Sequence, residues 1–187
     1  MPDIIDNFTE KDGIVMIDPA MGDGGKLYSI FDMDYVKANK TLCAKADIVT
    51  PNITEAAFML DMEYKTEYDK DYLIEMCEKL QQNGAKNVII TGVRKCEDEV
   101  GAFCLLENGE IYEYYNKRET TDFHGTGDIY SSTVYGALMK GKSIQDAVRF
   151  ACDYTKHCIA TTLAEPNHVT YGVNFEECTK DIIEFIS

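Results

Sequence analysis

The sequence lacks any stretch of concentrated positive charge. Its 187 residues include 33 acidic and 18 basic side chains, so the formal net charge is -15 at pH 7. Such a chain repels the phosphates of nucleic acids and of anionic lipids. It also has no apolar run of the roughly 20 residues that span a bilayer, and "MPDIIDNF" does not resemble a signal peptide. We therefore expect a cytoplasmic protein with no nucleic-acid or membrane partner.

Cysteine pairs with metal-binding or redox spacing are absent as well. The seven cysteines include no C-x-x-C pair, and the three histidines lack the spacing of metal ligands. We expect the cysteines to be reduced and to pack as small hydrophobic side chains. The chain has no internal repeat or linker, and its 45% hydrophobic content is enough for one core. The sequence thus predicts a single domain over residues 1–187.

Apolar strands alternate with amphipathic helices along the chain. Three short β-branched segments are typical of strands buried in a parallel sheet: residues 13–18, 46–52 and 86–92. Residues 69–84 place four apolar side chains on one helix face: Leu73, Met76, Cys77 and Leu80. Gly84 then predicts the end of that helix. This order predicts a layered α/β domain.

The second half of the chain predicts a hairpin and further helices. Residues 100–117 have the pattern of two antiparallel strands joined at Asn108-Gly109. Ser143 and Asp146 have the spacing of a helix cap, and Asn174 with Glu177 repeats that spacing before the last helix. We therefore expect a mostly parallel sheet with an appended antiparallel pair.

The stretch "HGTGDIYSS" (residues 124–132) combines a glycine turn with the start of a helix. Gly125 and Gly127 let the backbone turn sharply and approach a ligand, and the residues after Asp128 are expected to begin a helix that attracts an anion. Tyr130 excludes a dinucleotide-binding fingerprint, because a third glycine is required there. Taken alone, the stretch also fits a structural turn with Asp128 as the helix N-cap.

A second group of polar residues lies at the ends of two predicted strands. The stretch "MGDGGKLY" (residues 21–28) is not a P-loop, because Ala20 and Leu27 occupy positions that need glycine and serine or threonine. "DPAMGD" (residues 18–23) and "TPNITE" (residues 50–55) nevertheless follow strands, where sheets of this kind bind ligands. The alternatives are that Asn52 and Glu55 form only a helix cap, and that Asp18 and Asp23 are solvated loop acids.

In order and combination, these motifs resemble the pyridoxal/pyridoxamine kinases of the ribokinase-like fold, close relatives of the hydroxymethylpyrimidine/phosphomethylpyrimidine kinases. The matching stretches are "DPAMGDGGKLY" (residues 18–28), "ADIVTPNITEAAFML" (residues 46–60), Thr91-Gly92, "HGTGDIYSS" (residues 124–132) and "YGVNFEE" (residues 171–177). The resemblance implies a layered α/β/α fold. It also implies ATP-dependent phosphorylation of a hydroxymethyl group on pyridoxal or pyridoxamine, in vitamin B6 salvage, or on hydroxymethylpyrimidine.

The resemblance assigns roles to residues of this chain. Asp128 is expected to be the catalytic base, and the backbone of Gly125, Thr126 and Gly127 to form an anion hole for the transferred phosphate. Asp23 and Glu55 are expected to hold Mg²⁺, which prefers one or two carboxylates together with water and phosphate. The residues expected to line the ATP phosphates and a monovalent-cation site are Asp18, Thr50, Asn52, Glu55 and Thr91.

The resemblance also predicts what this chain lacks. Members of the family begin with strands that carry the substrate-pocket motifs and a lid, whereas residues 13–18 correspond to a strand in the middle of the sheet. We therefore expect the ATP-binding and catalytic-base portion of the fold, truncated at the N-terminus. Its exposed sheet edge is expected to favour a homodimer or another association. The alternatives are a nucleotide-binding fragment without catalysis and, less favoured by the motifs, a sugar kinase of the wider ribokinase group.

Overall fold

The chain folds into two compact units in a computed structural model that describes residues 5, 7 and 13–187. Unit 1 contains the described residues up to Val93 together with Phe103–Glu113. Unit 2 contains Arg94–Ala102 and Tyr114–Ser187. A single domain over residues 1–187 stays a prediction.

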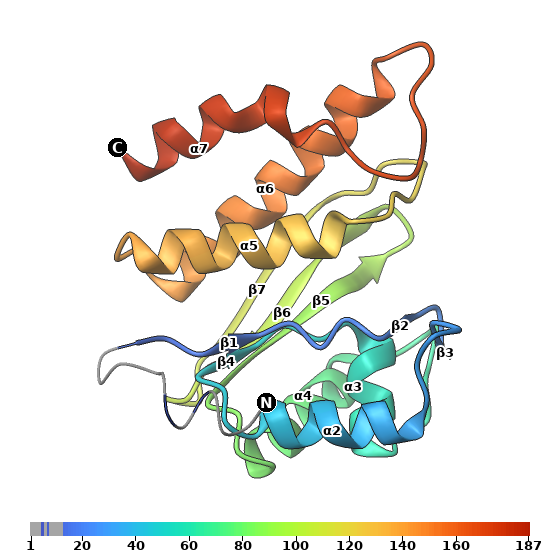
Figure 1. The fold of residues 1–187 in the computed structure, drawn as a ribbon, viewed down its shortest axis with the longest axis vertical. Coiled ribbons are helices and arrows are strands. Elements are labelled where there is room, and N and C mark those ends of the chain that lie inside the picture. Colours follow the sequence, from blue (N-terminus) through green and yellow to red (C-terminus); the bar gives the residue numbers. More distant parts are fainter. Residues whose placement is uncertain (1–4, 6, 8–12) are drawn as a thin grey trace. The chain divides into compact units, whose positions relative to one another are not determined.

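The chain is mixed α/β, as the sequence predicts (Figure 1). The strands are β1 (Met16–Ile17), β2 (Gly22–Asp23), β3 (Lys26–Leu27), β4 (Ile48–Val49), β5 (Asn87–Cys96), β6 (Glu99–Leu105) and β7 (Ile111–Lys117). The helices are α2 (Met33–Cys43), α3 (Ile53–Leu60), α4 (Lys70–Gln82), α5 (Thr126–Met139), α6 (Ile144–Leu163), the 3-10 helix η1 (Phe175–Cys178) and α7 (Thr179–Ile186).

Five strands form one sheet in the order β1-β4-β5-β6-β7. β1 runs parallel to β4, with Ile17 opposite Val49, and β4 runs parallel to β5. β6 and β7 follow each other through the turn at Gly109, where φ is 83°. The predicted parallel sheet with an appended hairpin is therefore confirmed. The first two predicted strands are shorter than expected at both ends; beyond their carboxyl ends, Pro19 and Pro51 have no N–H to donate.

The core of unit 1 follows the predicted apolar pattern. β5 buries Val88, Ile89 and Ile90 completely, as expected for a strand covered on both faces. The predicted face of α4 is also buried, at Leu73, Met76, Cys77 and Leu80. Gly84 follows this helix at φ 122°, where an added Cβ would lie 2.4 Å from the carbonyl oxygen of Ala44. Both its conformation and its close packing therefore need glycine.

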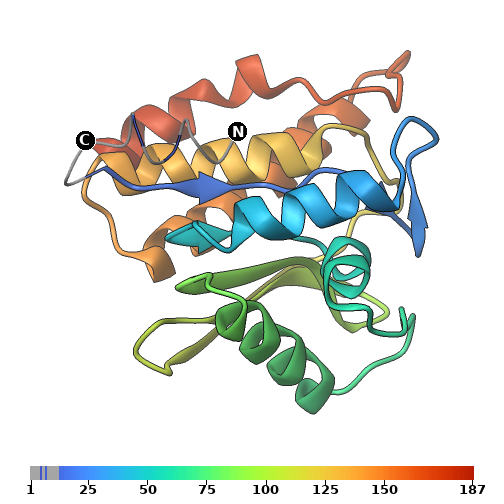
Figure 2. The same ribbon diagram turned by 60° about the horizontal axis from the view of Figure 1, so that its bottom comes forward.

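The helices of unit 2 pack side by side, with α6 against α5 (Figure 2). Ser143 caps α6 as predicted, because its hydroxyl accepts a hydrogen bond from the Asp146 amide at 3.1 Å. The buried face of α6 includes Ala147, Val148, Ala151 and Cys158. All seven cysteines are free thiols, and all but Cys96 are buried, as expected for small hydrophobic side chains; Cys96 is exposed, so the predicted packing is wrong there. None of the helices among the described residues combines the length and apolar character needed to cross a bilayer.

The cap predicted at Asn174 and Glu177 is wrong. The chain first forms the 3-10 helix η1 at Phe175–Cys178, and α7 begins only at Thr179. The Asn174 side chain donates instead to the Glu165 carboxylate, and its backbone N–H donates to Thr162 Oγ1 at 2.8 Å. Asn174 therefore ties the end of the loop to α6, and this tertiary contact replaces the local cap.

Candidate functional site

The glycine turn of unit 2 leads directly into α5. Gly125 has φ 80°, in the left-handed region, and the helix begins at Thr126 with no capping side chain among the described residues. The start of the helix therefore lies earlier than predicted, so the alternative interpretation of Asp128 as the N-cap is wrong. Asp128 lies in the first turn of α5 and is exposed. The sequence missed this boundary because αL glycine can end the turn without a side-chain cap.

The start of α5 has room for an anion close to the backbone. A Cβ added at Gly125 or at Gly127 would meet no described atom within 4 Å. The Thr126 hydroxyl turns back and donates to the Phe123 carbonyl at 3.2 Å. First-turn N–H groups and the helix dipole attract negative charge at such a position. The predicted anion hole at Gly125, Thr126 and Gly127 is therefore chemically reasonable, and its occupation stays a prediction.

The residue before the glycine turn region, Phe123, belongs to a buried hydrophobic cluster. Phe123 is buried with Tyr154, Cys158, Val173 and Cys178. The next residue, His124, donates its backbone N–H to the Thr170 carbonyl at 3.1 Å. The turn therefore starts from a fixed backbone, as preorganised binding requires.

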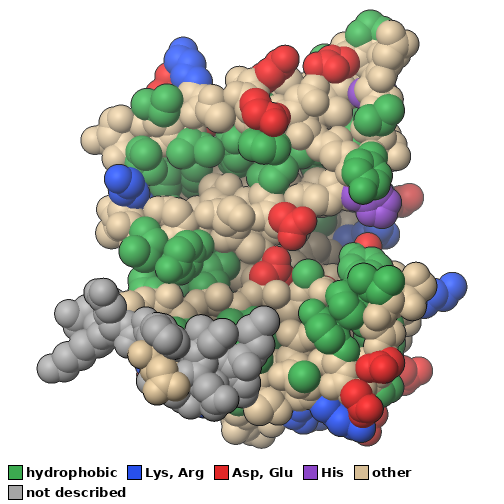
Figure 3. Space-filling model, in the orientation of Figure 1, with side chains coloured by type: hydrophobic (Ala, Val, Ile, Leu, Met, Phe, Trp, Pro, Cys, Tyr) green, Lys and Arg blue, Asp and Glu red, His purple; other side chains and the backbone are tan. Residues whose placement is uncertain are grey.

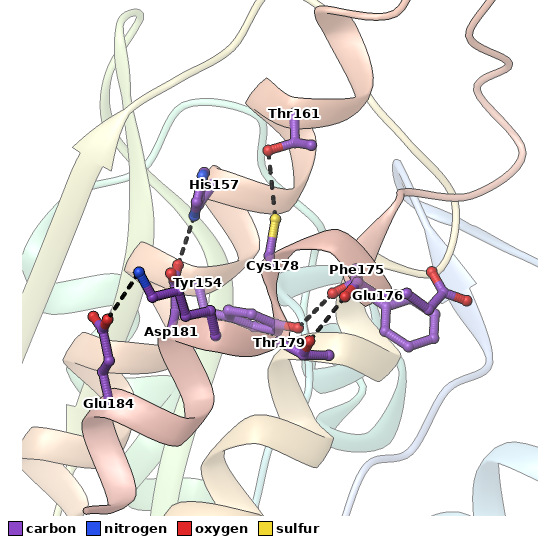
Figure 4. A network of polar contacts seen from close by, with 10 residues as sticks. Tyr154, His157, Thr161, Phe175, Glu176, Cys178, Thr179, Asp181 and Glu184 are labelled. Atoms are coloured by element: carbon purple, nitrogen blue, oxygen red, sulfur yellow. Dashed lines mark hydrogen bonds and ion pairs between the residues drawn. The ribbon is translucent and has the colours of Figure 1, made fainter.

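Polar contacts between α6 and the η1-α7 segment hold the same cluster together (Figure 4). The Tyr154 hydroxyl donates to the Phe175 carbonyl at 2.9 Å, and His157 Nδ1 lies 2.6 Å from Asp181 Oδ2. The C-terminal segment thereby covers the cluster on which the glycine turn rests.

In unit 1, the predicted residues gather at the carboxyl ends of neighbouring parallel strands. Asp18 follows β1, and the buried Thr50 follows β4, donating its N–H to the Ile17 carbonyl at 3.0 Å. Asn52, beyond the end of β4, forms an isolated parallel bridge with Thr91, which lies within β5. The structure therefore brings Asp18, Thr50, Asn52 and Thr91 to one edge of the sheet, where such folds bind ligands.

Asp23 lies on a small hairpin, where the sequence predicts a loop. β2 and β3 pair antiparallel, with Asp23 opposite Lys26, and Gly24 and Gly25 form the turn at φ 57° and 76°. The Gly-Gly pair is a known signal for a two-residue turn that needs positive φ, so this hairpin could have been predicted. Asp23 is exposed, and its Oδ1 accepts a hydrogen bond from the Gly24 N–H at 2.7 Å.

Glu55 is buried at the start of α3. Its side chain accepts a hydrogen bond from the Asn52 N–H at 2.9 Å while the Asn52 side chain accepts from the Glu55 N–H at 3.0 Å, which confirms the predicted capping box. Its other oxygen accepts from the Met21 N–H at 3.0 Å. Burial and, to a smaller extent, the nearby Asp18 charge together raise the pKa of Glu55 to about 7, although the N–H donors oppose the shift. Its role as a Mg²⁺ ligand stays a prediction.

The donor chemistry of unit 1 fits Mg²⁺ better than it fits a metal held by protein alone. Among the residues with described positions, no group of three His, Cys, Asp or Glu side chains could hold a metal ion. Mg²⁺ needs only one or two carboxylates when phosphates and water supply the other oxygens. Asp23 is exposed for this role, whereas both oxygens of Glu55 already accept backbone hydrogen bonds.

The predicted residues therefore form two groups, each built within one unit. Unit 1 holds Asp18, Asp23, Thr50, Asn52, Glu55 and Thr91, and unit 2 holds Gly125, Thr126, Gly127 and Asp128. That the two groups act on one ligand is a prediction from the sequence.

Comparison with known proteins identifies the family. The family model described as phosphomethylpyrimidine kinase matches residues 3–174. A hydroxymethylpyrimidine/phosphomethylpyrimidine kinase of Haemophilus influenzae is 29% identical over 86% of this chain and 58% of its own length. A pyridoxine kinase of Bacillus subtilis is 32% identical over 75% of this chain and 51% of its own length.

A solved structure supports the same assignment. A crystal structure assigned as a phosphomethylpyrimidine kinase from Bacteroides thetaiotaomicron, in a form with pyridoxal, has a TM-score of 0.90 and 29% identity. It covers 99% of this chain, and the chain covers 65% of it. This chain thus spans less than two thirds of each of these relatives. The ribokinase-like fold expected from the motifs is confirmed, and the chain belongs to the phosphomethylpyrimidine kinase family.

Proposed function

We propose that this chain supplies the ATP-binding and catalytic-base portion of a kinase that phosphorylates the hydroxymethyl group of pyridoxal or pyridoxamine. The observation that carries the proposal is the start of α5, which has a left-handed glycine, an uncapped first turn and the exposed Asp128. These are the two elements that phosphoryl transfer needs from a protein: donors for phosphate charge and a base for the hydroxyl proton.

The chemistry divides between the backbone and one side chain. The transferred phosphoryl group passes through a loose transition state with its charge on the phosphate oxygens. Backbone N–H groups of Gly125, Thr126 and Gly127 would stabilise that charge. Asp128 would accept the substrate proton late, as the hydroxyl oxygen bonds to phosphorus.

The unit 1 residues would bind the rest of the nucleotide. Asp18, Thr50, Asn52, Glu55 and Thr91 are proposed to contact the ATP phosphates and a monovalent cation. Asp23, together with Glu55, is proposed to hold Mg²⁺, which neutralises phosphate charge when bound. The exposed carboxylate of Asp23 and the position of these groups beyond parallel strands support this part of the proposal.

A second substrate is favoured by a specific comparison. The Haemophilus relative is a hydroxymethylpyrimidine/phosphomethylpyrimidine kinase, whereas the Bacillus relative is a pyridoxine kinase and the Bacteroides crystal form contains pyridoxal. Hydroxymethylpyrimidine is therefore the second candidate. We also propose a cytoplasmic location and self-association, for which β1 lies at the edge of the sheet that the described residues form.

The test is isothermal titration of MgATP into the purified chain, followed by coupled ADP release with pyridoxal, pyridoxamine and hydroxymethylpyrimidine. We expect saturable MgATP binding and ADP release that depends on one of these substrates. Binding without release would instead support a nucleotide-binding fragment that needs its substrate-binding part from elsewhere. No binding at millimolar MgATP would contradict the proposal.

A further inference from the structure

The β2-β3 hairpin is too short to hold its own shape. Each strand has two residues, and an isolated two-stranded hairpin is marginal in water even when longer. The Asp23 carboxylate is bonded to the Gly24 N–H within the turn, so its position depends on the position of the hairpin tip. Something outside the hairpin must therefore hold the tip in place.

The N-cap residue and the first turn of α3 supply three hydrogen bonds to this hairpin and to Met21, the residue before it. The hairpin lies beside α3 (Figure 1). Glu55 accepts from the Met21 N–H at 3.0 Å, and the Asn52 side-chain amide donates to the Gly22 carbonyl at 2.8 Å. Thr54 Oγ1 accepts from the Gly25 N–H at 3.0 Å. Two of these bonds hold the base of the hairpin, and the Thr54 bond holds its tip.

Packing at Gly25 strengthens this attachment. A Cβ added at Gly25 would lie 2.6 Å from the Tyr64 ring, whereas one added at Gly24 would meet no described atom within 4 Å. The tip therefore presses against Tyr64 on the side of Gly25. Thr54 itself is only 2% exposed, so its hydroxyl is directed by the surrounding core.

We propose that Thr54 is a positioning residue for magnesium-dependent ATP binding, because its hydroxyl holds the hairpin tip and with it the Asp23 carboxylate. The inference rests on the proposed function, since it takes Asp23 as a Mg²⁺ ligand beside the ATP phosphates. Thr54 acts through the Gly25 amide and does not itself contact the nucleotide. Neither a helix-capping role nor a core-packing role for Thr54 requires this bond.

The first test compares Thr54→Val, which keeps the shape and removes the acceptor, with Thr54→Ser, which keeps the acceptor. Loss of one hydrogen bond predicts MgATP binding weaker by about 3- to 10-fold for Thr54→Val and within about 2-fold of the parent for Thr54→Ser. ATP binding in EDTA should be unchanged in both variants. An equal loss with and without Mg²⁺ would indicate a general structural defect and would overturn the inference.

A second experiment follows the hydrogen bond between Thr54 and the Gly25 N–H without any nucleotide. Amide hydrogen exchange at Gly25, measured by NMR, should speed up by about 3- to 10-fold in Thr54→Val and stay slow in Thr54→Ser. Faster exchange with unchanged MgATP affinity would show that the bond exists but does not position Asp23. Failure of the unsubstituted chain to bind MgATP would overturn the proposed function, and this inference with it.

Alanine substitutions at Gly24 and Gly25 test the inference even if Thr54→Val does not fold. Gly24→Ala and Gly25→Ala impose similar strain, because both residues have positive φ, but only Gly25→Ala collides with Tyr64. We expect Gly25→Ala to weaken MgATP binding more than Gly24→Ala by at least about 3-fold, as for loss of one contact. Equal MgATP affinities of the two variants would contradict a role for the contact between the hairpin tip and Tyr64.

Discussion

Asp128 has the exposure and the surroundings that a base for phosphoryl transfer needs. It lies in the first turn of α5, two residues after the helix begins, and no capping bond occupies it among the described contacts. Glu55 is the opposite case, a carboxyl that is 3% exposed and bonded to two backbone N–H groups. Two acidic residues that look alike in the sequence therefore have different surroundings in the folded chain.

For Asp128, we expect Asp128→Asn to lower kcat by about 10²- to 10⁴-fold, the usual contribution of a general base. The MgATP dissociation constant should change by less than about 3-fold, because the amide keeps the size of the side chain. Steady-state kinetics and titration calorimetry measure the two effects. Asp71→Asn is the matched control, since Asp71 is an exposed acid in the first turn of α4. Unchanged kcat in Asp128→Asn would exclude the base.

For Glu55, the raised pKa predicts a pH dependence of stability. Its pKa is about 7 in the folded chain and 4.5 as its ordinary value, so the folded state binds the proton more tightly. Stability from this group is fully present below pH 4.5 and is lost as the pH rises through 7, by about 3 kcal/mol. Urea unfolding in EDTA should show this slope in the parent chain but not in Glu55→Gln.

The matched control for that experiment is Glu67→Gln, at an exposed position. It should keep the slope of the parent chain. A constant difference in unfolding free energy between the parent and Glu55→Gln from pH 4.5 to 8 would contradict the burial effect.

At the scale of elements, the first turn of α5 and the first turn of α3 present their N–H groups differently. The first turn of α3 is capped by the Asn52-Glu55 capping box, whereas α5 begins at Thr126, directly after Gly125, with no capping side chain among the described residues. A capped first turn has fewer donors left for a ligand. The structure thus favours α5 as the anion site and α3 as the support of the β2-β3 hairpin.

Glycine substitutions within α5 separate ligand binding from helix stability. Gly127→Ala and Gly136→Ala both place a Cβ where no described atom lies within 4 Å. Each should stabilise the chain by roughly 0.5–1 kcal/mol in urea unfolding, because alanine favours helix. Only Gly127→Ala should weaken MgATP binding, by about 10-fold or more, since the methyl group blocks close approach of a phosphate to the backbone. Equal MgATP affinities would place the anion elsewhere.

On the scale of the whole molecule, exposed apolar surface and negative charge have opposite effects on self-association. Several large apolar side chains of unit 1 are exposed, namely Tyr28, Ile30, Met33 and Tyr35. Figure 3 shows hydrophobic side chains reaching the surface. Exposed apolar side chains favour association, whereas a net charge of -15 makes copies of the chain repel each other.

This balance predicts salt-dependent self-association. Sedimentation velocity should show a larger species at 0.3 M salt than at about 0.01 M, because the Debye length falls well below the roughly 30 Å that applies at 0.01 M. Ile30→Glu should reduce the effect, since Ile30 is 80% exposed and its replacement adds repulsion. Ile111→Glu, at a less exposed position, is the comparison. A monomer at high concentration in both salts would contradict the proposed association.

The local order of the chain was readable from its sequence because helices and strands have characteristic apolar periods. The face of α4, the hairpin at Asn108-Gly109 and the cap at Ser143 all follow from residues close together in the chain. The ordered motifs likewise predicted the family, because their order and combination resemble those of its members.

Contacts between distant residues were not readable in that way. Three hydrogen bonds depend on segments that folding brings together. They join the Gly25 N–H to Thr54, the Met21 N–H to the buried Glu55, and the Asn174 side chain to Glu165. Hydrophobic period and turn chemistry act over a few residues, whereas burial and long-range hydrogen bonds depend on the packed chain. The sequence therefore determined which elements form and which family they belong to, and folding determined which carboxylate is buried and which stays exposed.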